Sequence, residues 1–418
     1  MNRFSMKLIS ELKLENSGTN LQIIEFNEKN SIVLIIIADE EGFLNFYSLN
    51  EKFELKKLHK FQLECKSEIW QMKYLKINKN EYLIYIGSAA GGIYAYKIKF
   101  DFKLNENDSQ LINGIELTWK QKANDMITKM EIKDLNNDEQ LRLIVTSLDN
   151  TIRVLNPYNG DLIWGQIFQS GVTTFTITES LNYLKLNEND ICRKFIIASS
   201  IDGSLRVFRG DNGELINFIQ LPNNIREILI YKTILICACD DFNVYFIKFE
   251  PNNKLNIIYK IFFNAYPWIL KINNNKLIIF TYSFNFMEGI IEKISDQIPS
   301  IKIIELNKLL YKNMNFECIL TNIEKINAQT VLSIEDIKYF NKINLEDNNN
   351  EKLFETLSKY LIVATTEKKI YLLNIETSQL LDISTSDGII NDMNLIFFTK
   401  KFYLIYIDDE KFFKIIEL

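Results

Sequence analysis

The sequence predicts an all-β fold, a single closed β-propeller built from four-stranded blades. One unit recurs along the 418 residues: a buried apolar run, an acidic or Gly-containing turn, and then an alternating strand rich in aromatics. Clear copies are Ile35–Tyr47, Ile84–Tyr96, Leu143–Leu155, Phe195–Phe208, Ile234–Phe246 and Leu361–Leu373. The copies recur at intervals of roughly 40 to 60 residues, which is the period of a propeller blade.

Each expected blade runs from the strand before one of these hairpins to the strand after it. The expected blades are 20–60, 68–121, 126–168, 171–221, 225–263, 265–306 and 314–384, followed by an incomplete unit from 388 to the end. We therefore count eight blades in one domain, residues 1–418. Seven blades remain the alternative, because Leu277–Ile291 keeps its apolar runs but lacks the acidic turn.

The two chain ends complement one another. The last unit supplies three strands, 389–397, 402–407 and 412–418, whereas Met6–Leu14 is a strand without a blade of its own. Antiparallel pairing of Met6–Leu14 with Phe412–Leu418 would close the ring and cover an exposed sheet edge.

Composition opposes several classes of function. The chain has 48 Lys and Arg against 54 Asp and Glu, a net charge of −6, which opposes nucleic-acid binding. His59 is the only histidine and lies in a Lys-rich segment, so no Ser-His-Asp or multi-histidine mechanism is expected. We expect no enzyme activity and no cofactor.

The cysteines and the lengths of the apolar runs indicate the cellular compartment of the chain. The five cysteines lack metal-binding spacing, and Cys237 and Cys239 would point to one face of a strand, as core residues do. The N-terminal residues read as a strand and no apolar run approaches the roughly 18 residues of a membrane span. We expect a cytoplasmic chain with no membrane span.

Two segments resemble known propeller repeats. Lys133–Leu155 is similar to FG-GAP repeats, which occur in Bardet-Biedl-type trafficking subunits and integrin-like proteins. Thr151–Trp164 resembles the quinoprotein (PQQ-like) repeat, and Leu205–Ile216 and Ile370–Leu381 echo it. The Gly-His and Trp-Asp pairs of WD40 repeats are absent, so the chain is WD40-like in architecture only. These resemblances imply a scaffold, with membership of a trafficking coat or signalling complex as the family-level expectation.

The FG-GAP resemblance also implies a candidate calcium site. Asp134, Asn136 and Asp138 place oxygen ligands at alternating positions of one loop. Glu139 stands where the repeat has Gly, and Arg142 stands where it supplies a closing carboxylate. The alternative is a turn in which Asp and Asn side chains bond to the local backbone.

Two inserts interrupt the blade period, at 100–114 and 322–358. Spacing of apolar residues predicts a helix over Ser333–Ile343, either docked on its blade or used for partner binding. Trp70, Trp119, Trp164 and Trp268 are expected mainly to pack between sheets, although exposed Trp favours binding.

The leading hypothesis is a non-catalytic scaffold that binds other proteins within a larger assembly. Acidic residues recur in the turns after the second strand of most blades; if the repeats are in phase, these residues gather on one face and attract a partner with a basic surface. These residues are Asp39, Glu40, Glu41, Asp149, Asp202, Asp240, Asp241, Glu367, Asp408 and Asp409. Turn geometry alone is the competing explanation. The alternative functions are a ligand- or calcium-binding propeller and a quinoprotein-like enzyme.

Overall fold

The computed structural model describes residues 7–27, 32–50, 52–100, 112–178, 194–250, 254–273, 275–283, 300–306, 319–324, 328–333, 338–339, 359–398 and 401–418. In these residues the chain is all-β and forms eight blades, seven of four antiparallel strands and one of five strands that includes a single parallel pair. The predicted propeller of eight blades is thereby confirmed. No helix in the described part is long and apolar enough to cross a membrane.

One compact unit comprises Met1–Ser88, Tyr96–Glu116 and Ala328–Leu418. Its blade 1 consists of β2 (Gly18–Asn27), β3 (Ile32–Asp39), β4 (Phe43–Leu49) and β5 (Leu55–Gln62). Its blade 7 consists of β26 (Ala328–Ser333), β28 (Tyr360–Thr365), β29 (Lys369–Asn374) and β30 (Leu380–Thr385). Its blade 8 consists of β1 (Lys7–Lys13), β33 (Phe412–Glu417), β32 (Lys401–Asp408), β31 (Ile390–Phe398) and β27 (Lys338–Tyr339).

The other unit comprises Ala89–Ala95 and Leu117–Asn327. Blade 3 has β10 (Ile127–Asp134), β11 (Leu141–Ser147), β12 (Thr151–Leu155) and β13 (Leu162–Ile167). Blade 4 has β14 (Val172–Thr178), β15 (Phe195–Ser200), β16 (Ser204–Arg209) and β17 (Leu215–Gln220). Blade 5 has β18 (Ile225–Tyr231), β19 (Ile234–Cys239), β20 (Asn243–Phe249) and β21 (Leu255–Phe262). Blade 6 has β22 (Tyr266–Asn273), β23 (Lys276–Tyr282), β24 (Ser300–Glu305) and β25 (Ile319–Glu324).

Blade 2 takes its strands from both units: β6 (Ile69–Lys76), β7 (Glu81–Ser88), β8 (Gly92–Phe100) and β9 (Ile112–Lys122).

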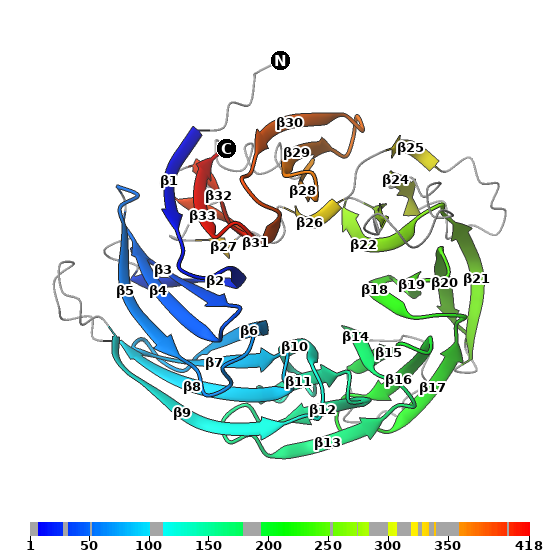
Figure 1. The fold of residues 1–418 in the computed structure, drawn as a ribbon. Coiled ribbons are helices and arrows are strands. Elements are labelled where there is room, and N and C mark those ends of the chain that lie inside the picture. The colour runs from blue at the N-terminus through cyan, green and yellow to red at the C-terminus, as the bar shows by residue number, and fades with distance from the viewer. Residues whose placement is uncertain are drawn as a thin grey trace, which may run out of the picture. The chain divides into compact units, whose positions relative to one another are not determined.

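Blade 8 joins the two ends of the chain, as predicted. β1 pairs antiparallel with β33 from Lys7 opposite Glu417 to Lys13 opposite Phe412, and Figure 1 shows the blue β1 beside the red β33. Without β1, the edge of β33 would expose unpaired backbone N–H and C=O groups. The strand is therefore the part of the N-terminal region that completes the last blade.

Blades 6 to 8 differ from the prediction in two ways. β25 pairs with β24, so it belongs to blade 6, whereas the sequence placed these residues in the seventh unit. The helix predicted over Ser333–Ile343 is wrong in its described residues. Ser333 ends β26, and Lys338 and Tyr339 pair parallel with β31, so strand pairing overrides the local helical spacing. The predicted insert 100–114 falls mainly on 101–111, outside the described residues, as do 334–337 and 340–358 of the second insert.

The second strand of each blade is the most buried, which explains the continuous apolar runs in the sequence. β3 is buried from Val33 to Asp39, and β19 is buried along its whole length, including Cys237 and Cys239, which face one core as predicted. Adjacent blades share apolar clusters, for example Ile37 with Ile407 between blades 1 and 8. Each fully buried side chain of this kind stabilises the fold by about 1.5–3 kcal/mol.

The innermost strand of each blade carries a bulge, at its second residue in seven blades and at its third residue, Trp268, in blade 6. In several blades the bulged side chain bonds to the next blade: the Thr19, Thr128 and Thr173 hydroxyls each donate to a backbone carbonyl there at 2.8 Å. In blade 8, the amide of Asn391 donates to the carbonyl of Gly18 at 2.8 Å. A bulge frees one residue from pairing within its own sheet, so its side chain can link two blades.

Candidate functional site

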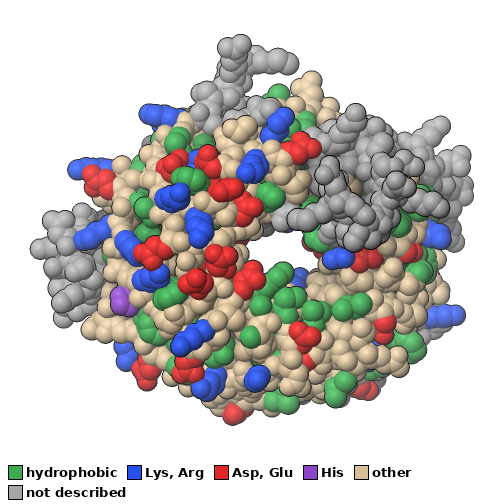
Figure 2. Space-filling model, viewed as in Figure 1, with side chains coloured by type: hydrophobic (Ala, Val, Ile, Leu, Met, Phe, Trp, Pro, Cys, Tyr) green, Lys and Arg blue, Asp and Glu red, His purple; other side chains and the backbone are tan. Residues whose placement is uncertain are grey.

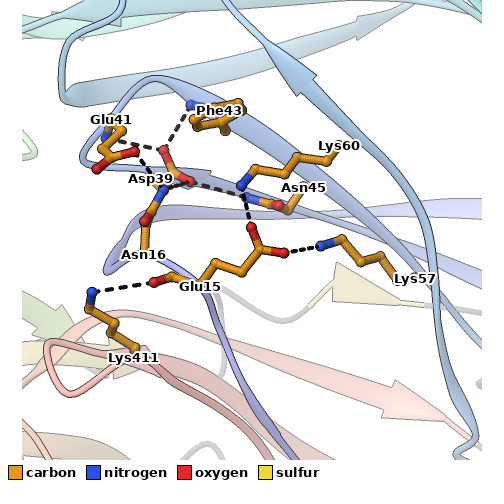
Figure 3. Close-up of polar contacts among 9 residues, drawn as sticks. All are labelled: Glu15, Asn16, Asp39, Glu41, Phe43, Asn45, Lys57, Lys60 and Lys411. Carbon is orange, nitrogen blue, oxygen red and sulfur yellow. Dashed lines mark hydrogen bonds and ion pairs between the residues drawn. The ribbon is translucent and has the colours of Figure 1, made fainter.

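Asp39 fixes the turn between β3 and β4. Its carboxylate, 2% exposed, accepts the backbone N–H groups of Glu41 (3.1 Å) and Phe43 (2.8 Å). It also accepts the side-chain amides of Asn16 (3.1 Å) and Asn45 (3.3 Å), as Figure 3 shows. This carboxylate supports the hairpin, and its neighbours Glu40 and Glu41 are the exposed acids of the turn.

Asp408 has the same role between β32 and β33. Its buried carboxylate accepts the backbone N–H of Phe412 at 2.8 Å and of Gly388 at 3.2 Å. Burial raises the pKa of Asp408, the two hydrogen bonds oppose that shift, and the charges of Asp387 and Asp409 add to it. The next residue, Asp409, is exposed and accepts the backbone N–H of Ile389 at 2.6 Å.

The corresponding aspartates of blades 3 to 5 also accept turn hydrogen bonds. Asp149, Asp202 and Asp241 each accept the backbone N–H of the residue two positions later, at 2.9 to 3.1 Å. Asp149 also pairs with Arg153 at 2.7 Å, and Asp240 pairs with Arg226 at 2.6 Å. Burial raises the pKa of Asp149, but hydrogen bonds from Thr151 and Asn124 and the Arg153 charge outweigh it, so the pKa lies below its usual value.

The acids of blades 1, 7 and 8 provide more exposed charge. Six exposed acids lie in the second-to-third-strand turns or in the connection into blade 8: Glu40, Glu41, Glu367, Asp387, Asp409 and Glu410. Together they are called the acidic turn set. Sequence reasoning identified four of them and missed two: Asp387 lies outside the repeated turn, and Glu410 lies in it at the position of Glu41 but was passed over. Figure 2 shows acidic side chains on this part of the surface with lysines between them.

Lysines neutralise part of the acidic turn set. Lys414, on β33, pairs with Asp387 and with Glu11. Lys368 lies 3.7 Å from the carboxylate of Glu410. No ion pair is recorded for Glu40, Glu41, Glu367 or Asp409 in the described part of the chain.

Glu15 is a charged residue that sequence reasoning missed. It lies between β1 and β2 and pairs with Lys57 at 2.9 Å and Lys60 at 2.5 Å, both on the outer strand β5 (Figure 3). Hydrogen bonds from Lys60 and Lys57 lower the pKa of Glu15 to about 2. The Nζ of Lys411 donates to the backbone carbonyl of Glu15 at 3.3 Å. More than 40 residues separate Glu15 from Lys57 in sequence, so no local pattern indicates this contact.

The candidate calcium ligands form a turn stabilised by backbone groups. The Asp134 carboxylate accepts the N–H groups of Asn136 (3.0 Å), Asp138 (3.3 Å) and Glu139 (2.8 Å). Arg142 lies 3.2 Å from the Asp138 carboxylate. Asn137 and Glu139 adopt positive φ, which aims successive N–H groups at Asp134. The described residues contain no group of three His, Cys, Asp or Glu arranged to hold a metal.

His59 and the tryptophans lie largely where the sequence placed them. His59 is exposed on β5, as predicted. Trp119 and Trp164 are buried, and their Nε1 groups donate to the carbonyls of Pro157 (2.9 Å) and Gly210 (3.0 Å) in the next blade. Trp268 is half-buried, and Trp70, at 45% exposure, is the most exposed of the four.

Comparison with known proteins supports the fold and gives no closer relationship. No family model matches the chain, and no curated protein matches it in sequence. Solved structures do match over almost the whole length. The computationally designed protein Ika8 has a TM-score of 0.62 at 12% identity, covering 99% of this chain and all of its own.

Two natural proteins give similar matches. BamB from Moraxella catarrhalis has a TM-score of 0.58 at 11% identity, with 99% of this chain and 98% of BamB covered. The WD40 domain of Neurospora crassa Pan2 has a TM-score of 0.53 at 10% identity, with 100% and 96% covered. The chain is a β-propeller similar in fold to PQQ-like and WD40 propellers. At these identities the likeness concerns the fold alone.

Proposed function

We propose that this propeller is a non-catalytic, cytoplasmic scaffold that binds a partner with a basic surface through the acidic turn set. Propellers commonly serve as scaffolds for protein interaction, because their turns are presented on a rigid framework. The proposal rests on one observation: the buried acids of these turns and their exposed neighbours have different roles. Asp39 and Asp408 are buried and satisfy the turns, whereas Glu40, Glu41, Glu367 and Glu410 are exposed.

The hydrogen bonds that close these turns come from other residues; in the β28–β29 turn, which contains Glu367, they come from Thr365. The Asx-type hydrogen bonds that close the β3–β4 and β32–β33 turns come from Asp39 and Asp408. Of their exposed neighbours, Glu40 accepts the backbone N–H of Ser17 and Glu41 accepts the side-chain amide of Asn16, each at 3.2 Å. The negative charge of these exposed acids would speed the approach of a basic partner. Membership of a trafficking coat or signalling complex is one setting in which such a scaffold would work.

Charge reversal tests the proposal while the hydrogen bonds of Asp39 and Asp408 to their turns are kept. A variant with Glu40→Lys, Glu41→Lys and Glu410→Lys leaves Asp39 and Asp408 in place. The matched control makes the same change in net charge at exposed glutamates outside the set, with Glu54→Lys, Glu116→Lys and Glu376→Lys. Affinity capture from native extract, quantified by mass spectrometry, would compare both variants with the natural chain at low and high salt.

We expect a reproducible set of partners to bind the natural chain and the control, and to be lost by the variant and at about 0.5 M salt, where charge interactions are screened beyond about 4 Å. Binding that is equal for the variant and the control, or that is insensitive to salt, would refute the acidic turn set as the binding surface.

A further inference from the structure

The outer strands of blades 3 to 5 expose an unusual amount of apolar side chain. Ile167 on β13 is 73% exposed, and Phe218 on β17 and Phe262 on β21 are each 62% exposed. The full set, here called the apolar rim, is Leu162, Ile163, Ile167, Leu215, Phe218, Ile257, Ile258 and Phe262. All eight residues belong to the unit formed by Ala89–Ala95 and Leu117–Asn327.

These residues lie on strands whose outer edges carry no further strand. β13, β17 and β21 each end the strand order of their sheet, and Figure 1 shows them as successive outer strands. β17 and β21 are in contact. The Arg206 guanidinium of blade 4 donates to the carbonyl of Ile167 at 2.9 Å, which ties the end of β13 to the following blade. The outer strands of the three blades are thus linked, β13 to blade 4 through Arg206 and β17 to β21 by direct contact.

The rim lacks the charges that normally protect such edges. Lys260 is the one charged residue in β13, β17 and β21. By contrast, the outer strand β5 of blade 1 contains three lysines and His59. Lysines on an edge strand oppose pairing with another chain, and an uncharged apolar edge favours it.

We propose that the apolar rim is a self-association surface, on which a second copy of this chain docks through two-fold pairing centred on β17. In a two-fold interface a surface meets itself, so each charge faces the same charge. β5 would place lysines against lysines, whereas β17 has no charged residue to oppose its copy. A second copy fits this uncharged edge without a charge penalty.

The available area is sufficient for a stable dimer. The exposed fractions of the eight rim residues add up to about four whole residues, or about 800 Å² at about 200 Å² each, which equals the contribution of one partner to an interface of standard size. Exposed aromatic residues such as Phe218 and Phe262 also supply much of the binding energy at protein interfaces. This inference is independent of the acidic turn set, which lies on other blades.

Sedimentation velocity of the full chain between about 1 and 100 µM tests the proposal directly, since interfaces of this area reach micromolar affinity or better. We expect a monomer–dimer equilibrium that stops at the dimer. A variant with Ile167→Lys and Phe218→Lys should weaken dimerisation by at least about tenfold. The matched control, Leu8→Lys with Leu381→Lys, adds the same charge at outer-strand residues that are 52% and 41% exposed and lie outside the rim. It should dimerise like the natural chain.

Hydrogen exchange provides a measurement on the natural chain that needs no variant to fold. Amides of β17 should gain protection between low and high protein concentration, while those of the outer strand β30 should not. A monomer at every concentration, open-ended aggregation, or equal weakening by the rim variant and the control would overturn the proposal. So would dimerisation without added protection in β17.

Discussion

Blades 1 and 8 differ from blades 3 to 5 in where their charges lie. In blades 1 and 8 the outer strands β5 and β1 carry lysines and glutamate, and the turns expose further acids. In blades 3 to 5 the outer strands are almost uncharged, and turn aspartates such as Asp149 and Asp240 pair with arginines. All these blades have the same hairpins, so the fold does not dictate the difference. These outer strands are largely exposed, so the same blade fold accepts either charged or apolar side chains on them.

The largest effect expected from this comparison is the loss of β1. Deleting residues 1–13 would expose the edge of β33 and remove Ile9 and Leu12, which pack on the shared core of blades 1 and 8. Two half-buried apolar side chains and the strand pairing should contribute at least about 3 kcal/mol, so we expect a lower melting temperature and aggregation. Thermal melting with light scattering measures both. Deleting residues 1–6 is the control, and equal melting of the two truncations would contradict the role of β1.

The next effect separates the two faces of a single outer strand. Trp164 on β13 is buried, donates to the Gly210 carbonyl, and packs on Gly213, whose φ is +74°. Trp164→Ala should cost about 3–5 kcal/mol because it leaves a cavity between blades 3 and 4. Ile167→Ala on the same strand removes an exposed side chain and should change stability by less than about 0.5 kcal/mol. Urea unfolding checks both, and similar losses would mean that Ile167 is not a surface residue.

The sequence predicts the structural features that depend on residues close together in the chain, and it predicts less well those that depend on packing between distant segments. The hairpins and the end strand follow from alternation and turn residues, which act within a few positions. The turn chemistry was only partly foreseeable: the positive-φ position holds Gly42, Gly203 and Asn150, but also Phe242 and Lys368. The identity of the buried acids was not foreseeable. Asp39 and Glu40 are neighbours in sequence, and only packing makes one a turn ligand and the other a surface charge.

The same reasoning explains the missed features. β17 reads Leu-Ile-Asn-Phe-Ile-Gln, a pattern that sequence analysis assigns to the core as readily as to an outer strand. Its exposure depends on its place at the edge of its sheet. The ion pairs of Glu15 are formed with Lys57 and Lys60, which lie on β5, far from Glu15 in the sequence. Contacts of this kind arise from topology rather than from local pattern.

The pH dependence of stability should have opposite signs for Asp408 and Asp149. The raised pKa of Asp408 means that the folded state binds its proton more readily, so its contribution falls as pH rises from the usual Asp value through the raised value. The lowered pKa of Asp149 gives stability that is present above the usual value and lost on acidification. Asp149→Asn should therefore cost about 1–3 kcal/mol at pH 7 and less near pH 3.5.

The free energy of unfolding of Asp408→Asn, relative to that of the natural chain, should be higher at pH 7 than at pH 4. This trend is opposite to the one expected for Asp149→Asn. Urea unfolding across this range measures both variants. If the stability of both variants follows the same pH trend, the opposite pKa shifts inferred for Asp408 and Asp149 are wrong.

The smallest expected effect concerns the charges that hold β5 to the segment before β2. Glu15 pairs with Lys57 and Lys60 on the surface, where water and salt weaken such contacts. Because its pKa is lowered to about 2, its contribution is present above the usual Glu value and fades as the pH falls toward 2. Glu15→Gln should lower the melting temperature by about 1 °C at low salt, and the difference should vanish at about 0.5 M salt. Differential scanning calorimetry at both salt concentrations measures it. A larger loss that persists in salt would show that Glu15 supports the fold through more than charge, and the contrast between charged and apolar outer strands would then be structural rather than a property of the surface.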